Sequence, residues 1–146
     1  MKYLYSVIAG FALIYMGFIA DMAFAEDINA SETGYCGMCG KEISSKANIK
    51  FSLVFPNGNE QSFSCAGCGL GAIKAGGAKS ARTLDFMRGE WVDAKEAWYV
   101  MGSDFGSCCP PYWVSFANKD EAEKFSKGFG GDVFNYEEAL NQVGKK

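Results

Sequence analysis

The cysteines constrain this chain more than any other residue type, because they come in three close pairs and no histidine accompanies them. The pairs are Cys36-Gly-Met-Cys39, Cys65-Ala-Gly-Cys68 and the adjacent Cys108-Cys109. Without histidine the chain can form neither a Ser-His or Cys-His nucleophile pair nor a histidine-ligated zinc site. We therefore expect that the protein is not an enzyme and that its chemistry depends mainly on sulfur.

The spacing of the cysteines predicts a metal site. Two C-x-x-C pairs that bracket a predicted β-hairpin have the spacing of a four-thiolate site. Thiolate is a soft ligand that favours Cu(I), Zn(II) or iron–sulfur over Ca(II) and Mg(II). Adjacent cysteines also suit a metal, or separate bridges to other cysteines, because a disulfide needs Cα atoms about 4.4–6.8 Å apart and a trans peptide holds them at about 3.8 Å. The candidate ligands are Cys36, Met38, Cys39, Cys65, Cys68, Cys108 and Cys109. A further thioether, that of Met101, is expected to fill the core instead.

Charge argues against nucleic acid as a partner. The 146 residues include 14 Lys and Arg against 17 Asp and Glu, a formal net charge of −3. A nucleic-acid protein needs a clustered surplus of positive side chains to neutralise phosphates, and the sequence contains no basic stripe.

The first 25 residues have the pattern of a secretory signal peptide. Lys2 provides a positive start, residues 3–20 form an apolar run, and Ala23-Phe24-Ala25 is a small-x-small cleavage signature. Cleavage after Ala25 predicts a periplasmic or otherwise exported protein that is soluble once processed. The alternative is a retained membrane anchor, because the run approaches the roughly 17 residues that a spanning helix needs. In an exported compartment, cysteines serve as disulfides, metal ligands or redox groups.

Residues 26–88 are predicted to form an N-terminal ββαβ unit that carries both C-x-x-C pairs. Apolar and polar residues alternate over 49–55, and Asn57-Gly58 predicts a tight turn into a second strand over 60–64. A glycine-rich helix over 66–75 and a strand over 83–87 complete the unit.

Residues 89–146 are predicted to form a C-terminal ββαβ unit. Strands are expected over 97–101 and 112–117, followed by a helix that Asn118 caps, with Glu121 in the capping-box position. A strand over 132–135 and a short helix over 137–143 follow. Units of this size are too small for assured stability alone, so we expect them to share a core. The predicted fold class is therefore α+β, with two small ββαβ units after the signal peptide.

The second half contains four distinctive segments, which are Trp91–Gly102, Trp113–Ala117, Glu121-Ala122 with Phe125, and Gly130–Phe134. In these segments the chain resembles the nitrous-oxide reductase accessory proteins of the NosL type. Looser matches extend this resemblance to Cys39-Gly40 and Phe63-Ser-Cys65 in the first half. The resemblance implies a pair of ββαβ domains and an exported Cu(I)-binding metallochaperone. Its client would be a periplasmic copper enzyme such as nitrous-oxide reductase.

The chain departs from the family pattern at its cysteines. Cys108-Cys109-Pro110 stands where the family shows Pro-Met-Gly, so Cys109 takes the methionine position. The family's usual lipoprotein cysteine is absent. The resemblance therefore implies copper binding by a more thiolate-rich site.

Two other functions fit the same residues. A structural zinc module would use Cys36, Cys39, Cys65 and Cys68, and it would bind Zn(II) tightly and unfold without it. A periplasmic thiol–disulfide protein would use one C-x-x-C pair, exchange reversibly with a dithiol and need no metal.

Overall fold

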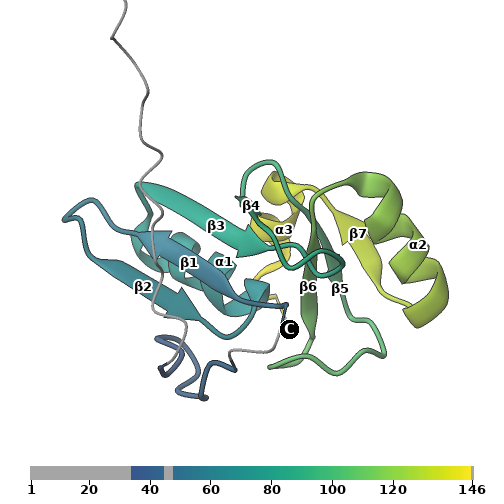
Figure 1. Cartoon of the computed structure of the whole chain (residues 1–146), viewed down its shortest axis with the longest axis horizontal. Helices are drawn as coiled ribbons and strands as arrows, with labels where there is room; N and C mark the ends of the chain where they lie inside the picture. Colours follow the sequence, from purple (N-terminus) through teal and green to yellow (C-terminus); the bar gives the residue numbers. More distant parts are fainter. Residues whose placement is uncertain (1–33, 45–47, 146) are drawn as a thin grey trace, which may run out of the picture.

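The computed structural model describes residues 34–44 and 48–145, which form two small antiparallel sheets and three helices (Figure 1). In chain order the elements are β1 (Phe51–Val54), β2 (Glu60–Phe63), α1 (Ala66–Gly76), β3 (Ser80–Leu84), β4 (Trp91–Asp93), β5 (Trp98–Met101), β6 (Trp113–Phe116), α2 (Lys119–Phe129), β7 (Asp132–Phe134) and α3 (Tyr136–Gln142). The predicted α+β class is confirmed. The predicted signal peptide lies outside the described residues. Within the described ranges, none of the helices combines the length and the apolar character that a bilayer crossing requires.

The first sheet has the strand order β2-β1-β3-β4, and α1 packs against it. Its hairpin turns at Gly58, whose φ of +84° favours glycine, as the Asn-Gly signal predicted. The glycines of α1 permit close packing. A Cβ at Gly69 would collide with the ring of Phe51, and one at Gly67 would collide with the indole of Trp113. The glycine-rich sequence of this helix therefore reflects contact with both halves of the chain.

The strand predicted over 83–87 is present but lies earlier in the chain, because β3 begins at Ser80 and ends at Leu84. The fully buried Asp85 turns the chain there, since its carboxylate accepts hydrogen bonds from the backbone N–H of Arg88 and of Ala117, both at 2.6 Å. The chain then returns as β4, a strand that the sequence patterns did not predict. Because β4 pairs with β3, the first sheet includes residues beyond the predicted boundary at residue 88.

The second sheet has the order β6-β5-β7, with α2 packed against it. Asn118 caps α2 by accepting a hydrogen bond from the backbone N–H of Glu121 at 3.1 Å, as predicted. The Glu121 carboxylate binds the guanidinium group of Arg88. Helix α3 begins with a complete capping box formed by Asn135 and Glu138, which the sequence patterns did not predict.

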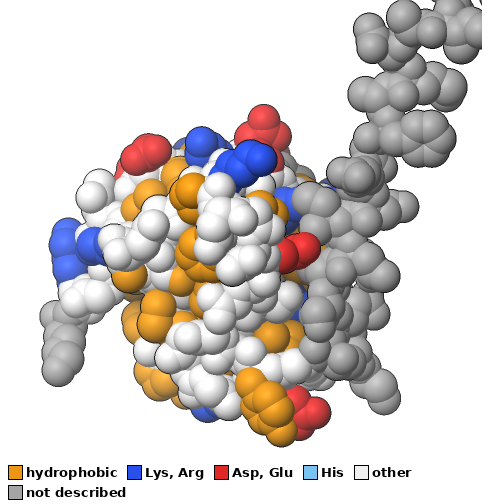
Figure 2. Space-filling model, turned by 90° about the vertical axis from the view of Figure 1, so that its left-hand side faces the viewer, with side chains coloured by type: hydrophobic (Ala, Val, Ile, Leu, Met, Phe, Trp, Pro, Cys, Tyr) orange, Lys and Arg blue, Asp and Glu red, His pale blue; other side chains and the backbone are white. Residues whose placement is uncertain are grey.

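The two sheets share a hydrophobic core, as predicted. Tyr99, Trp113 and Tyr136 of the second half pack in one buried cluster with Phe51 and Leu53 of the first. A second cluster lies between α2 and its sheet. Seen from the side of the β1–β2 hairpin, hydrophobic side chains gather in the middle of the visible face and charged ones lie mostly toward its edges (Figure 2).

Candidate metal centre

Four thiols converge where the two halves meet. The sulfur atoms of Cys39, Cys68, Cys108 and Cys109, which we call the four-sulfur group, all lie within 4.8 Å of one another. The Sγ–Sγ distance is 3.7 Å between Cys39 and Cys108 and 3.2 Å between Cys108 and Cys109. All six cysteines of the chain are free thiols. A tetrahedral ion about 2.3 Å from each sulfur would separate the sulfurs by roughly 3.8 Å, so the group has the dimensions of a soft-metal site.

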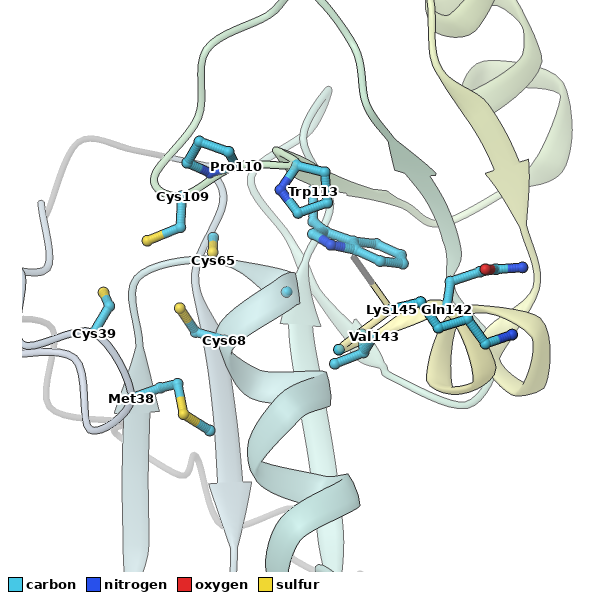
Figure 3. Close-up of a pocket in the computed structure, with 13 residues that line it drawn as sticks. Met38, Cys39, Cys65, Cys68, Cys109, Pro110, Trp113, Gln142, Val143 and Lys145 are labelled. Atoms are coloured by element: carbon cyan, nitrogen blue, oxygen red, sulfur yellow. The ribbon is translucent and has the colours of Figure 1, made fainter.

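Three segments far apart in the sequence supply these thiols. Cys39 lies in a tight loop before β1, closed by a backbone hydrogen bond from Gly40 N–H to Cys36 C=O at 2.9 Å. Cys68 lies in the first turn of α1. Cys108 and Cys109 lie in the loop between β5 and β6. Figure 3 shows Cys39, Cys68 and Cys109 around one open space, which the packing of both halves creates.

Two polar side chains at the group were not identified from the sequence. The hydroxyl of Ser64 lies 2.8 Å from the sulfur of Cys108 and 3.4 Å from that of Cys39. The ammonium group of Lys41 donates a hydrogen bond to the carbonyl oxygen of Cys108 at 2.5 Å. The only sequence signal for either residue is its position one or two residues from a C-x-x-C cysteine. Their contacts tie the first half to the Cys108 loop.

The thiols differ in acidity. Partial burial opposes ionisation of Cys39, but hydrogen bonds from Ser64 and the Lys41 backbone outweigh it and lower the pKa of Cys39 to about 6. A hydrogen bond from Cys68 lowers the pKa of Cys65 to about 6 despite burial. The same hydrogen bond, together with burial, raises the pKa of Cys68, and burial raises that of Cys108. Thiolate and protonated thiol thus lie side by side, and a metal that binds the protonated ones must displace their protons.

The structure groups the predicted ligands differently from the two-pair hypothesis. Each C-x-x-C pair contributes its second cysteine to the four-sulfur group, whereas the first cysteines, Cys36 and Cys65, are buried beside it. The adjacent pair from the second half completes the group. Met38 lies outside it and is half exposed, and Met101 packs against the core as expected.

A cavity of about 600 Å³ opens beside the four-sulfur group. Figure 3 shows the cysteines and Met38 on one side of it, with Trp113 and the end of the chain after α3 on the other. The walls are largely apolar, formed by Met38, Pro110, Trp113 and Val143. An ion held by these thiols would therefore be reachable from outside through an apolar vestibule.

The fold and the four-sulfur group together define a small two-sheet α+β protein with a sulfur-rich candidate site for a soft metal. The model of the NosL family matches residues 76–143, which confirms the resemblance over this part of the chain.

The crystal structure of the copper chaperone NosL from Shewanella denitrificans has the same fold. It superimposes with a TM-score of 0.67 at 20% sequence identity, covering 75% of this chain and 91% of that one. A curated relative, the HTH-type transcriptional repressor CutR of Bacillus subtilis (strain 168), is 30% identical over 111 residues. This match covers 74% of the chain but 57% of CutR, so the chain spans little more than half the length of this relative.

Proposed function

We propose that this chain is an exported Cu(I)-binding metallochaperone of the NosL type, which passes copper to a copper-requiring client protein. The observation that carries the proposal is the four-sulfur group, in which four thiols lie within 4.8 Å of one another. Thiolates select soft ions such as Cu(I), and the chain has no histidine that could serve as a nitrogen ligand. The NosL-type fold supports the same conclusion.

The openness of the group favours a transported ion over a structural one. Structural zinc sites are closed tetrahedra, often built from C-x-x-C pairs that each give both sulfurs to the metal. Here Cys39, Cys108 and Cys109 are only half buried, and two of the four-sulfur thiols come from the adjacent pair. Transfer to a client requires incoming ligands to reach the ion, and the cavity beside the group offers that access.

Other features support the proposed cellular location and client. The signal-peptide pattern of residues 1–25 supports export to the periplasm. Nitrous-oxide reductase is the client that the family resemblance suggests. Substitution of cysteine for methionine at position 109 changes the ligand set, so other periplasmic copper enzymes are equally suitable test acceptors.

An anaerobic competition titration tests the proposal. The reduced mature chain and its Cys39→Ala variant are titrated with Cu(I) against a chromogenic Cu(I) chelator, and with Zn(II) in parallel. We expect the wild-type chain to take Cu(I) from the chelator and the variant to lose much of that affinity. A Tyr35→Phe variant, changed at an exposed side chain in the same loop, is the matched control. Failure to compete for Cu(I), combined with unfolding on zinc removal, would support the structural zinc module instead.

A sensory role is the second candidate, because the relative that is 30% identical is described as a transcriptional repressor. A chaperone should give up its ion to a metal-free copper enzyme faster than the ion dissociates into buffer. A sensor should retain the ion. Transfer kinetics measured with a chromogenic acceptor distinguish the two functions.

A further inference from the structure

Two buried thiols lie directly beside the four-sulfur group and outside it. Cys36 is 3% exposed and Cys65 is fully buried. Each is the first cysteine of a C-x-x-C pair whose second cysteine belongs to the four-sulfur group. Backbone hydrogen bonds from Gly40 N–H to Cys36 C=O (2.9 Å) and from Gly69 N–H to Cys65 C=O (3.2 Å) close the turns that carry these two inner thiols.

All six cysteines pack in one cluster. Cys36, Cys65 and Cys68 are among its buried residues, and Cys39, Cys108 and Cys109 pack against it as partly buried side chains. Cys65 also lines the cavity together with Cys39, Cys68 and Cys109. Cys68 is thus the member of the four-sulfur group that is buried together with both inner thiols, and its raised pKa, caused first by a hydrogen bond with Cys65 and also by one with Cys36, agrees with this placement.

A single ion would bind only some of these six sulfur atoms. A four-coordinate ion is satisfied by four sulfurs, and Cu(I) accepts fewer, whereas a thiolate sulfur has lone pairs enough to bridge two ions. Four thiolates around one monovalent ion also leave an excess of negative charge in a partly buried place, which is costly. The ammonium group of Lys41 at this site already binds the Cys108 carbonyl oxygen. For a given set of thiolates, each further monovalent ion would reduce the excess by one charge without any further side chain.

Building on the proposed function, we propose that the six cysteines hold a thiolate-bridged cluster of at least two Cu(I) ions, with Cys36 and Cys65 as inner ligands and Cys68 as a bridging ligand. Each thiol that joins the cluster releases its proton to solvent, and copper stays in the Cu(I) state throughout. The competing role for Cys36 and Cys65 is that of small core side chains, which buried free cysteines often have.

The copper content of the intact chain tests the cluster. The reduced mature chain is loaded anaerobically with Cu(I) in the presence of a competing chelator, and bound copper is counted by native mass spectrometry. X-ray absorption on the same sample looks for copper–copper scattering. We expect two or more Cu(I) ions per wild-type chain, with a copper–copper contribution. The Cys36→Ala and Cys65→Ala variants should each hold at least one ion fewer and still bind copper.

The control separates loss of a ligand from loss of packing. Ile43→Val removes one methylene from a buried side chain in the same loop as Cys36 and leaves all six thiols in place, so its copper content should match the wild type. One ion per wild-type chain without copper–copper scattering would overturn the cluster while leaving the proposed function intact. Full copper content in both alanine variants would overturn the role of the inner thiols. No retained Cu(I) at all would refute the proposed function itself. Should an alanine variant fail to fold, the wild-type count and scattering decide alone.

Discussion

Replacement of Asp85 by alanine should destabilise the protein strongly, because this carboxylate joins the two halves. Asp85 is fully buried, and its two oxygens accept hydrogen bonds from the backbone N–H groups of Arg88 and Ala117, each at 2.6 Å. Ala117 follows β6 in the second sheet, whereas Asp85 follows β3 in the first. The bond to Ala117 therefore ties the end of one sheet to the end of the other.

The magnitude follows from the two donors that lose their acceptor. A buried donor left unsatisfied costs about 1–3 kcal/mol. If both donors counted as buried, the cost would be roughly 2–6 kcal/mol; Arg88 is exposed and Ala117 half buried, and this exposure, together with relief of the desolvation of the buried carboxylate, moves the value toward the lower end. We therefore expect a loss of about 3 kcal/mol in the free energy of unfolding, a large fraction of the roughly 5–15 kcal/mol typical of a domain. Asp85→Asn keeps one acceptor oxygen and should lose about half as much.

Urea denaturation of the reduced, metal-free chain, followed by tryptophan fluorescence, measures the effect. Asp93→Ala is the matched control, because the exposed carboxylate of Asp93 accepts one backbone hydrogen bond, from Lys95 at 2.8 Å. Its donor can bind water instead, so the control should lose less than about 1 kcal/mol. Equal losses in Asp85→Ala and Asp93→Ala would refute the reasoning that burial makes the Asp85 hydrogen bonds expensive to remove.

Three further predictions concern the thiols and processing. Cys109→Met should still bind Cu(I), but more weakly near neutral pH and with a shallower pH dependence, because a thioether has no proton to lose. Chelator competition between about pH 5 and 8 measures the affinity and its pH dependence. An unchanged pH dependence would contradict the prediction. Ser64→Ala should raise the pKa of Cys39 above about 6, so that the thiolate fraction of Cys39 and its alkylation rate fall at neutral pH. Mass-spectrometric peptide mapping measures the alkylation rate, and Ser62→Ala, on β2, is the control. The exported protein should begin at Glu26, and an intact mass that retains residues 1–25 in the membrane fraction would indicate an anchor.

Local sequence patterns predicted most of the fold. The alternation over 49–55 and the Asn57-Gly58 turn gave the β1–β2 hairpin, and the Asn118 cap marked the start of α2. The bounds of the strand predicted over 83–87 were displaced, because Asp85 ends β3 and is held by a backbone group 32 residues away, which no local pattern reveals. The three residues of β4 are too few to show a period.

The candidate ligands could be identified by residue type, but their grouping could not. The C-x-x-C spacing suggested that the two pairs of the first half would converge, because a short loop brings sulfurs together locally. The approach of Cys108 to Cys39 spans 69 residues and depends on how the halves pack. Gly67, which accommodates the indole of Trp113, is one residue that permits this packing. From the sequence alone, Gly67 was only a glycine that lowers the stability of a helix, and its packing role could not be predicted.

The position of the four-sulfur group links metal binding to the contact between the halves. Cys39 and Cys68 belong to the first half, and Cys108 and Cys109 belong to the second. A ligand that binds only the folded state stabilises it, by about 2.7 kcal/mol at a hundredfold excess over its dissociation constant. Here that free energy would act directly across the junction between the two sheets. The metal-free chain keeps this junction through hydrogen bonds such as the 2.6 Å contact between the hydroxyls of Thr83 and Ser115, which need no ion. Hydrogen bonds therefore hold the thiols near one another in the metal-free chain, so that metal binding need not first assemble the site, and metal release need not unfold it.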